Sequence, residues 1–500
     1  MQMRNSAGTY RLSAWQLTAI IVAGTLVRFF FGGFTHSWYS APDQLAWGLS
    51  LDEMLQSHHW RYIQIIHAPH EGGSFLIGLL SLALRPFDFL LPPLSLAALL
   101  VDTASRLVQV RIAQKLFGGR VAAWFGLWTV LAVPLLIPWA TIDFGLHALS
   151  AFFPFVFLYL AQTENSKHLG LRAGLFAAVA LSFSYDNIAL LPPLILCILT
   201  EKQYGRNLVI FFLSFGICML PHLYTRLWMD TGYFAENAGL LAGKSLAGPP
   251  LFAAAHFTNL RYVWSGAFPA SFMLSASDSL SPALTKNLVS VFVYGGFLFF
   301  AFYKGIAGKI RLVALLVIFF FIAAYCFSPF FADSISNHSF VYYRHLAYII
   351  PFAVLLMIAG FIQKAWGKWV IAAWLIFCAI ETLAYLQLPW PVKEPAYAPA
   401  GWILAKKYGS DAGRLFRIHS AAPAQYRDTL AFGFGWGLSA ALLSNPASQK
   451  AVPALVNMIQ QSPLQYRSKM VAGVRHSFEK GITPVLDGKL LRQFDSTLLQ

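Results

Sequence analysis

The stretch "AWQLTAIIVAGTLVRFFFGGF", residues 14–34, is the first of several long apolar runs in a chain of 500 residues. A helix of about 20 predominantly apolar residues is long enough to cross the hydrocarbon core of a bilayer. The run follows Arg4 and Arg11, exceeds the apolar region of a signal peptide and has no small-residue cleavage site. It therefore predicts a first transmembrane span that is retained in the protein.

The composition agrees with a chain built mainly of such spans. Hydrophobic residues make up 57% of the sequence and charged residues 11%, which excludes a single water-soluble core. The 36 Lys and Arg residues exceed the 21 Asp and Glu residues, but they lie in short clusters between apolar runs, as the positive-inside rule describes. The sequence thus predicts an all-α polytopic membrane protein with no nucleic-acid partner.

The sequence contains no pattern typical of a disulfide framework, a zinc site or a nucleotide-binding site. All four cysteines lie in apolar segments without metal-ligand spacing, so neither a disulfide framework nor a zinc site is indicated. The sequence also has no Walker A motif and no dinucleotide fingerprint. A nucleotide-activated substrate is therefore not expected.

The basic clusters orient the chain, because they mark cytoplasmic turns. These clusters are Arg111, Lys115 and Arg120; Lys167, His168 and Arg172; Lys202 and Arg206; Lys304, Lys309 and Arg311; and Lys364 and Lys368. The run 74–91 follows Gly72-Gly73 and breaks at Arg85-Pro86. We predict an interfacial or re-entrant helix there, since a crossing would place the basic 111–120 turn outside.

This interpretation predicts about eleven spans, an odd number that places the C-terminus on the non-cytoplasmic side. The spans after the first are expected near 94–112, 121–138, 144–162, 172–184, 188–201, 207–226, 286–303, 312–330, 346–363 and 369–388. The pair 172–201 is short and is interrupted by "SYDN" at 184–187. The loops expected on the non-cytoplasmic side are 36–93, 139–143 and 227–285.

The composition changes near Trp390, where prolines cluster and spanning runs end. We predict a transmembrane domain over 1–389 and a non-cytoplasmic, mainly helical soluble domain over 390–500. Within the second domain, "PAQYRDTLAFG" at 423–433 resembles "PLQYRSKMVAG" at 463–473. Helix-period apolar residues around both copies favour paired helices, although two similar helix starts can also arise by chance.

Two acidic residues lie in the predicted outer loops close to span ends. Asp43 follows the first span, and Asp143 lies in the short turn "PWATID" between two spans. An ionisable residue at the bilayer boundary is costly, so each is a candidate functional residue. In sugar transfer from a lipid phosphate, one carboxylate acts as general base and another orients the acceptor or holds a cation.

A donor phosphate also needs a cationic partner. Arg344 lies in "SFVYYRHLAYIIPF" beside Tyr343, and a guanidinium binds phosphate oxygens through two parallel hydrogen bonds. An interfacial anchor in an aromatic belt is the alternative interpretation of Arg344.

Four segments of the sequence resemble glycosyltransferases of the GT-C type, specifically the protein O-mannosyltransferase and aminoarabinose transferase families. The first is 43–84, with Asp43-Gln44 at the place of an Asp-Glu pair, followed by "EMLQSHHW" and "APHEGGSFLIGLL". The others are "RLVQVRIAQKLFGGRVAAWFGLW" at 106–128, "IPWATIDFGLHALSAF" at 137–152 and "YYRHLAYIIPFAVLL" at 342–356. The resemblance covers roughly 10–360; Gln44 and "HEGG" depart from it.

The resemblance implies a GT-C-like helix bundle that uses a polyprenyl-phosphate-sugar donor. Asp43 would be the general base and Asp143 the supporting carboxylate. His70 and Glu71 would line the acceptor side and are candidates for a divalent metal ion, while Tyr343 and Arg344 would bind substrate. Hydrogen-bonded interfacial histidines are the alternative to a metal site. Asp52-Glu53 is an alternative acidic motif, unless both residues form the solvated face of an amphipathic helix.

These inferences predict a membrane glycosyltransferase of the cell envelope. It would transfer a sugar to a lipid, glycan or protein acceptor on the periplasmic, non-cytoplasmic face of a bacterial inner (plasma) membrane. Two alternatives stay open. One is a lipid-linked sugar transporter or flippase, for which Asp186 in the "SYDN" break would be the central residue. The other is a non-catalytic membrane anchor that presents residues 390–500 to a partner.

Overall fold

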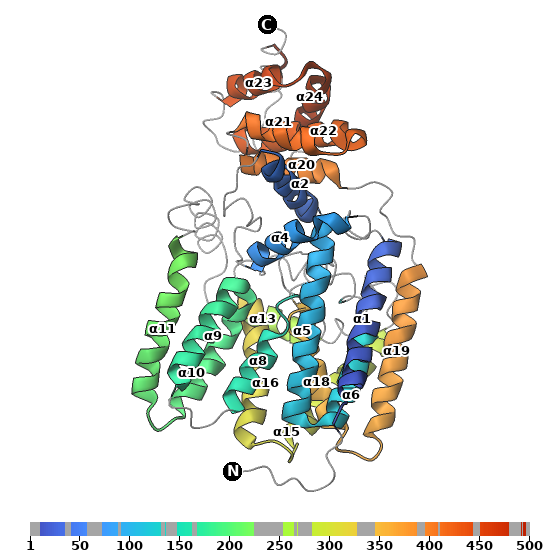
Figure 1. The fold of residues 1–500 in the computed structure, drawn as a ribbon, viewed down its shortest axis with the longest axis vertical. Coiled ribbons are helices and arrows are strands. Elements are labelled where there is room, and N and C mark those ends of the chain that lie inside the picture. Colours follow the sequence, from blue (N-terminus) through green and yellow to red (C-terminus); the bar gives the residue numbers. More distant parts are fainter. Residues whose placement is uncertain are drawn as a thin grey trace. The chain divides into compact units, whose positions relative to one another are not determined.

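The structure is a computed structural model, and its description covers most of the predicted helices. The described residues are 11–35, 42–57, 73–88, 92–131, 136, 148–162, 168–224, 254–264, 268, 283–327, 346–387, 396–408, 411–443, 451–479, 492 and 494–496. They form helices, turns and bends and include no strand. The predicted all-α class is therefore confirmed (Figure 1).

Contacts divide the chain into two compact units. Unit 1 comprises Met1–Thr35 and Ala68–Pro389, and unit 2 comprises His36–His67 and Trp390–Gln500. The sequence analysis placed 36–67 with the transmembrane domain, whereas in the structure this loop clusters with the C-terminal residues.

Unit 1 is a bundle of apolar helices. Its helices are α1 (Ala14–Thr35), α4 (Gly73–Leu84), η2 (Arg85–Phe87), α5 (Pro93–Phe117), α6 (Gly119–Val130), α8 (Phe153–Gln162), α9 (Leu169–Phe183), η3 (Tyr185–Leu190), α10 (Leu191–Leu199), α11 (Tyr204–Tyr224), α13 (Ala254–Tyr262), α15 (Ala283–Ala301), α16 (Gly308–Phe327), α18 (Ile350–Phe361) and α19 (Gly367–Gln387).

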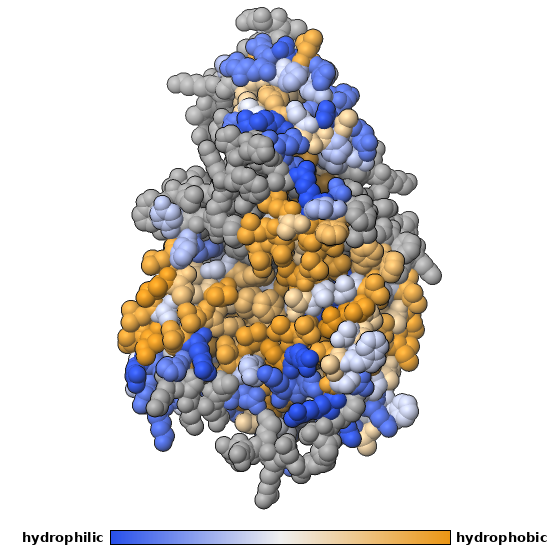
Figure 2. Space-filling view, viewed as in Figure 1, coloured by the Kyte–Doolittle hydropathy of each residue, from blue (hydrophilic) through white to orange (hydrophobic). Residues whose placement is uncertain are grey.

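Three helices of the described residues are long and apolar enough to cross a membrane: α1 over Ala14–Phe31, α11 and α16. The exposed side chains of α11 indicate the surroundings of these helices. Val209, Phe212 and Ile217 are 60%, 57% and 65% exposed, which suits lipid and is unfavourable in water. Figure 2 shows the corresponding apolar belt of unit 1, with hydrophilic residues below it. The chain is a polytopic membrane protein, and the count of about eleven spans stays a prediction.

The apolar helices are interrupted at the positions that the sequence predicted. Helix α4 has 12 residues and ends before Arg85-Pro86, which begin η2. At about 1.5 Å per residue, α4 is too short to cross about 30 Å of hydrocarbon alone. The "SYDN" interruption likewise becomes the 3-10 helix η3 between α9 and α10. Gly170 and Gly174, spaced as in a small-xxx-small motif, let α9 approach the α11 backbone closely.

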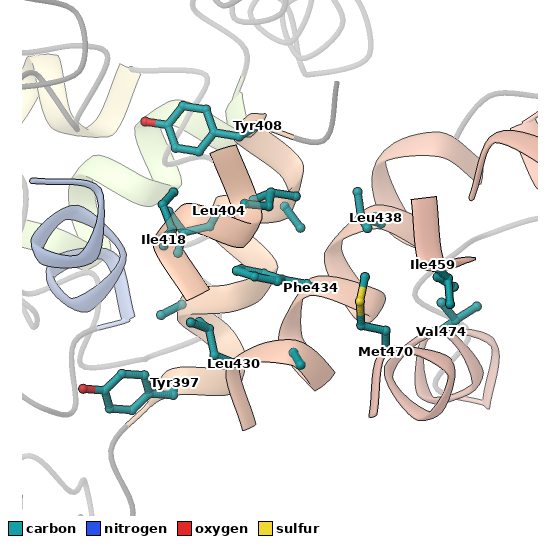
Figure 3. Close-up of a cluster of buried hydrophobic side chains, with 14 of the residues drawn as sticks. Tyr397, Leu404, Tyr408, Ile418, Leu430, Phe434, Leu438, Ile459, Met470 and Val474 are labelled. Atoms are coloured by element: carbon teal, nitrogen blue, oxygen red, sulfur yellow. The ribbon is translucent and has the colours of Figure 1, made fainter. Parts of the chain in front are cut away.

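Unit 2 combines one helix of the first loop with the C-terminal helices. Its elements are α2 (Pro42–Ser57), α20 (Tyr397–Tyr408), α21 (Ala412–Ala421), η7 (Ala424–Tyr426), α22 (Arg427–Leu443), α23 (Ala451–Gln461) and α24 (Leu464–Glu479). One hydrophobic core runs through all six α-helices, and Figure 3 shows much of it. Leu404, Phe434 and Val474 line it from α20, α22 and α24, and Ala46 and Leu49 join it from α2.

The internal repeat corresponds to matching helix starts. Arg427 donates from Nε to the Ala422 carbonyl at 2.9 Å, and Arg467 donates from Nε to the Ser462 carbonyl at 3.0 Å. Each arginine thus binds the carbonyl five residues before it, at the end of the preceding helix, where carbonyls lack intrahelical partners. The expectation of paired helices is confirmed, and chance similarity does not account for equivalent contacts.

Candidate functional site

Of the predicted site residues, only Asp43 falls on a described element. It is the second residue of α2, directly after Pro42. A proline in the first position and an acid in the first turn both favour a helix start at this point. Asp143, His70, Glu71, Tyr343 and Arg344 lie outside the described residues. Their roles stay predictions.

Helix α2 is held in unit 2 by a buried ionic cluster. The Glu53 side chain is 3% exposed, and its Oε1 accepts a hydrogen bond from Arg417 Nε at 2.7 Å. Its Oε2 lies 3.4 Å from Arg414 Nε, and the Arg414 side chain is 8% exposed. Arg414 also lies over the Tyr408 ring, with its Cζ 3.7 Å from the centroid.

This cluster corrects one expectation and bears on another. The interpretation of Asp52 and Glu53 as a solvated face is wrong for Glu53, because this carboxylate is buried between two arginines of α21. Because both of its oxygens pair with these arginines, the Glu53 carboxylate is bound within unit 2, which does not favour the alternative acidic motif Asp52-Glu53. Asp52 is half-buried on the same helix.

In unit 1, the "SYDN" break forms a polar cluster with Tyr348, which lies just before α18. Asn187 is buried and donates from Nδ2 to the carbonyls of Ala180 and Ser184 at 2.8 and 3.1 Å. These carbonyls lie at the C-terminal end of α9 and also accept the backbone N–H groups of Ser184 and Asn187, so the Asn187 amide adds a second hydrogen bond to each. The Tyr348 hydroxyl donates to Asn187 Oδ1 at 2.7 Å, and the Tyr348 ring stacks on Phe321.

The neighbouring residues extend this cluster to α11. The Tyr185 hydroxyl lies 3.0 Å from His222 Nε2. His222 is in the last turn of α11, at the opposite end from Lys202, which precedes the helix, and Arg206, which lies in its first turn. The cluster therefore lies at the ends of the helices that are opposite the basic turns, and it includes Asp186, which interacts electrostatically with Tyr348. The interrupted run revealed Asp186, but no sequence signal revealed that His222 of α11 and Tyr348, just before α18, join the cluster.

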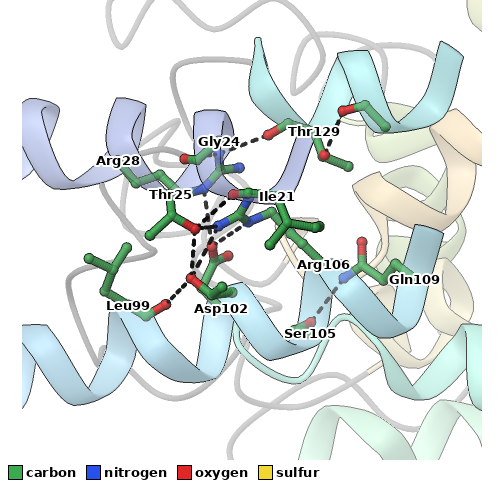
Figure 4. A network of polar contacts seen from close by, with 12 residues as sticks. Ile21, Gly24, Thr25, Arg28, Leu99, Asp102, Ser105, Arg106, Gln109 and Thr129 are labelled. Carbon is green, nitrogen blue, oxygen red and sulfur yellow. Dashed lines mark hydrogen bonds and ion pairs between the residues drawn. The ribbon is translucent and has the colours of Figure 1, made fainter. Parts of the chain in front are cut away.

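A second polar cluster joins α1, α5 and α6 within the apolar layer (Figure 4). Asp102 Oδ2 lies 2.7 Å from Arg106 Nε and 3.2 Å from Arg28 Nε, and both arginine side chains are 3% exposed. Arg28 also donates to the Thr129 carbonyl at 2.8 Å, and Arg106 donates to Thr25 Oγ1 at 2.8 Å. Groups from three helices thus contact the same charged side chains, which suits this cluster to hold spans together.

The described residues contain no group of three or more His, Cys, Asp or Glu side chains that could hold a metal ion. The metal candidates His70 and Glu71 lie outside those residues.

No family model and no curated protein matches this chain. Among solved structures, the chain is similar to the crystal structure of ArnT from Cupriavidus metallidurans bound to undecaprenyl phosphate. The two share 16% sequence identity with a TM-score of 0.44, over 94% of this chain and 78% of that chain.

Proposed function

We propose that the chain is a membrane glycosyltransferase that moves a sugar from a polyprenyl-phosphate donor to an acceptor on the non-cytoplasmic face. Asp43 takes the proton of the acceptor hydroxyl or amine as the acceptor attacks the anomeric carbon. The bond from that carbon to the phosphate oxygen breaks, and the lipid phosphate leaves. Undecaprenyl phosphate belongs to this lipid class; the proposal rests on the residues of this chain.

The observation that carries the proposal is the position of Asp43 in the first turn of α2, a few residues after the membrane span α1 in the sequence. The span α1 ends at Thr35, and α2 begins at Pro42 with Asp43 next to it. A lipid phosphate and an aqueous acceptor meet at such a boundary. A helix that is anchored by its own core gives the base a defined position, which catalysis requires.

The composition of unit 2 supports the non-cytoplasmic topology. A loop that follows α1 and a domain that follows α19 contribute to one hydrophobic core. Residues that share a core lie on one side of a bilayer, so α1 and α19 end on the same side. The basic turns near Lys202, Lys304 and Lys364 then mark the opposite, cytoplasmic side.

The remaining predicted residues have roles that the reaction requires. Arg344 would bind the donor phosphate with Tyr343, and Asp143 would orient the acceptor. His70 and Glu71 would line the acceptor side, with or without a metal ion. Tyr348, four residues after Arg344 in the sequence, is hydrogen-bonded to Asn187.

To test this proposal, purified protein in lipid nanodiscs is incubated with radiolabelled polyprenyl-phosphate sugars and membrane extract. We expect a labelled acceptor product, and Asp43→Asn should lower turnover about 10²–10⁴-fold, the usual contribution of a positioned base. Asp143→Asn should also lower turnover, and Arg344→Lys should weaken use of the donor. Full activity of Asp43→Asn would disprove the role of this residue as the base.

A transporter of lipid-linked sugars is the second candidate, favoured by the break between α9 and α10. Discontinuous helices with an ionisable residue form the binding sites of many transporters, and Asp186 lies in η3. In proteoliposomes, a transporter would move a labelled lipid-linked sugar across the bilayer without producing a labelled acceptor. Transport that requires Asp186 and is unaffected by Asp43→Asn would favour this function over sugar transfer.

A further inference from the structure

Unit 2 has the organisation of a short helical repeat array. The helices α20, α22 and α24 pack in succession, and α21 and α23 each precede their partners α22 and α24 as the first helix of a hairpin. In such arrays each repeat covers the apolar face of its neighbour, and at least three repeats are usual. The C-terminal sequence alone provides two complete hairpins and the single helix α20.

Helix α2 supplies the helix that α20 lacks. It packs against both α20 and α21, as the first helix of a preceding hairpin would. Ala46 and Leu49 are 0% and 5% exposed and belong to the same hydrophobic core as Leu404 and Ile418. The first hairpin of the array is therefore composed of α2 and α20. In the sequence these two helices are separated by the second segment of unit 1, Ala68–Pro389.

The Glu53 cluster fixes the position of α2 against α21, the next helix of the array. The ion pair between Glu53 and Arg417 joins residues that are 364 positions apart. Hydrophobic contacts tolerate sliding, whereas a buried carboxylate between two guanidinium groups has few equivalent positions. The cluster thus sets both the rotation of α2 and its position along its own axis.

We infer that Glu53 is a positioning residue, which holds α2 and with it Asp43 against the repeat array. The inference rests on the proposed role of Asp43 as the base. Asp43 and Glu53 are ten residues apart on one helix, or about 15 Å along its axis, so a displacement at Glu53 is transmitted to the first turn. The C-terminal domain would then be required for activity because it orients the loop that carries the base.

The first measurement needs no activity. Backbone hydrogen exchange is followed over 42–57 in the full-length protein and in Glu53→Gln, with Asp52→Asn as the matched control on the same helix. We expect exchange of α2 to accelerate at least about tenfold in Glu53→Gln, because the buried guanidinium of Arg414 then lacks a carboxylate. It should stay within about twofold in Asp52→Asn. Unchanged exchange in Glu53→Gln would overturn the inference whatever reaction the protein performs.

The second measurement separates positioning from simple loss of folded protein. Turnover is measured per molecule that binds donor, and we expect kcat to fall about 10²-fold in Glu53→Gln with little change in KM for the donor. Glu53→Asp should restore part of kcat. An unchanged kcat per donor-binding molecule would show that Glu53 is only structural and would overturn the inference.

Arg417→Ala provides a milder variant should Glu53→Gln fail to fold, because the Arg417 side chain is 53% exposed. Like Glu53→Gln, this variant should accelerate hydrogen exchange of α2 and lower kcat. No change in either quantity would count against the positioning role. If α2 exchange rises but no donor yields a product even with the unmodified protein, the role of Glu53 in holding α2 is supported and the glycosyltransferase proposal fails.

Discussion

The two units contain ionic clusters of the same composition, one carboxylate with two arginines, but in different surroundings. In unit 1, Asp102 and both of its arginines are at most 11% exposed and lie among apolar spans. In unit 2, Glu53 and Arg414 are buried, whereas Arg417 is 53% exposed. The first cluster has no access to water for its surplus positive charge, and the second does.

This difference indicates different tasks. A charge cluster within hydrocarbon is costly and persists where several helices satisfy it, as α1, α5 and α6 do here. A cluster at the edge of a water-exposed domain costs less to build, and it specifies which surfaces meet. We therefore expect the unit 1 cluster to determine whether the bundle assembles and the unit 2 cluster to determine where α2 lies.

The largest effect should follow from Asp102→Asn. This change leaves two buried guanidinium groups without a carboxylate, and breaking a buried ion pair in this way costs about 3–5 kcal/mol. We expect a strong loss of folded protein, measured by thermal unfolding in detergent. Thr103→Val on the same helix is the control, because it removes a hydroxyl that accepts from Arg106 at 3.3 Å but leaves the carboxylate in place. An Asp102→Asn protein as stable as that control would disprove the structural role.

Within unit 2, Arg414→Ala should be more damaging than Arg417→Ala. Arg414 is 8% exposed and also contacts the Tyr408 ring, so its loss should cost about 2–4 kcal/mol. Arg417 is half-exposed, and its loss should cost about 1 kcal/mol. Protease resistance of unit 2 in the full-length chain measures both, and equal effects would contradict the ranking by burial.

The pH dependence of unit 2 should reflect His419. Burial lowers the pKa of this imidazole below its ordinary value, although its hydrogen bond to the Arg427 carbonyl acts in the opposite direction. Below about pH 6.5 the unfolded chain then binds more protons than the folded one, so stability falls as the pH falls toward the folded-state pKa. Proteolysis of unit 2 should accelerate over that range, and less so in His419→Gln. An identical pH profile in this variant would exclude His419 as the cause.

The smallest effect should come from Glu201→Gln, at the end of unit 1 that carries the basic turns. Its partner Lys309 lies 3.0 Å away, and the two side chains are 21% and 30% exposed. Because water screens such a pair, the cost should be below about 1 kcal/mol. A loss comparable to that of Asp102→Asn would show that exposure does not separate these ion pairs.

The sequence alone was sufficient for the class of the protein, the main breaks and the paired helices of the repeat. Apolar runs and basic clusters predict a helical membrane protein, since a bilayer admits few structures without unsatisfied backbone groups. The breaks at Arg85-Pro86 and at "SYDN" were visible because proline and short polar residues interrupt an apolar helix. These features depend on neighbouring residues, so periodicity and composition reveal them.

Only the tertiary structure decided which distant residues meet. Asp52 and Glu53 are adjacent acids with similar surroundings in the sequence, yet Glu53 is buried because Arg414 and Arg417 lie opposite it. The contacts of Asn187 with Tyr348 and of Tyr185 with His222 could likewise not be predicted from the sequence. Whether a charged residue is solvated or buried depends on the surface that packs against it. For Glu53, the sequence that forms this surface lies more than 350 residues away.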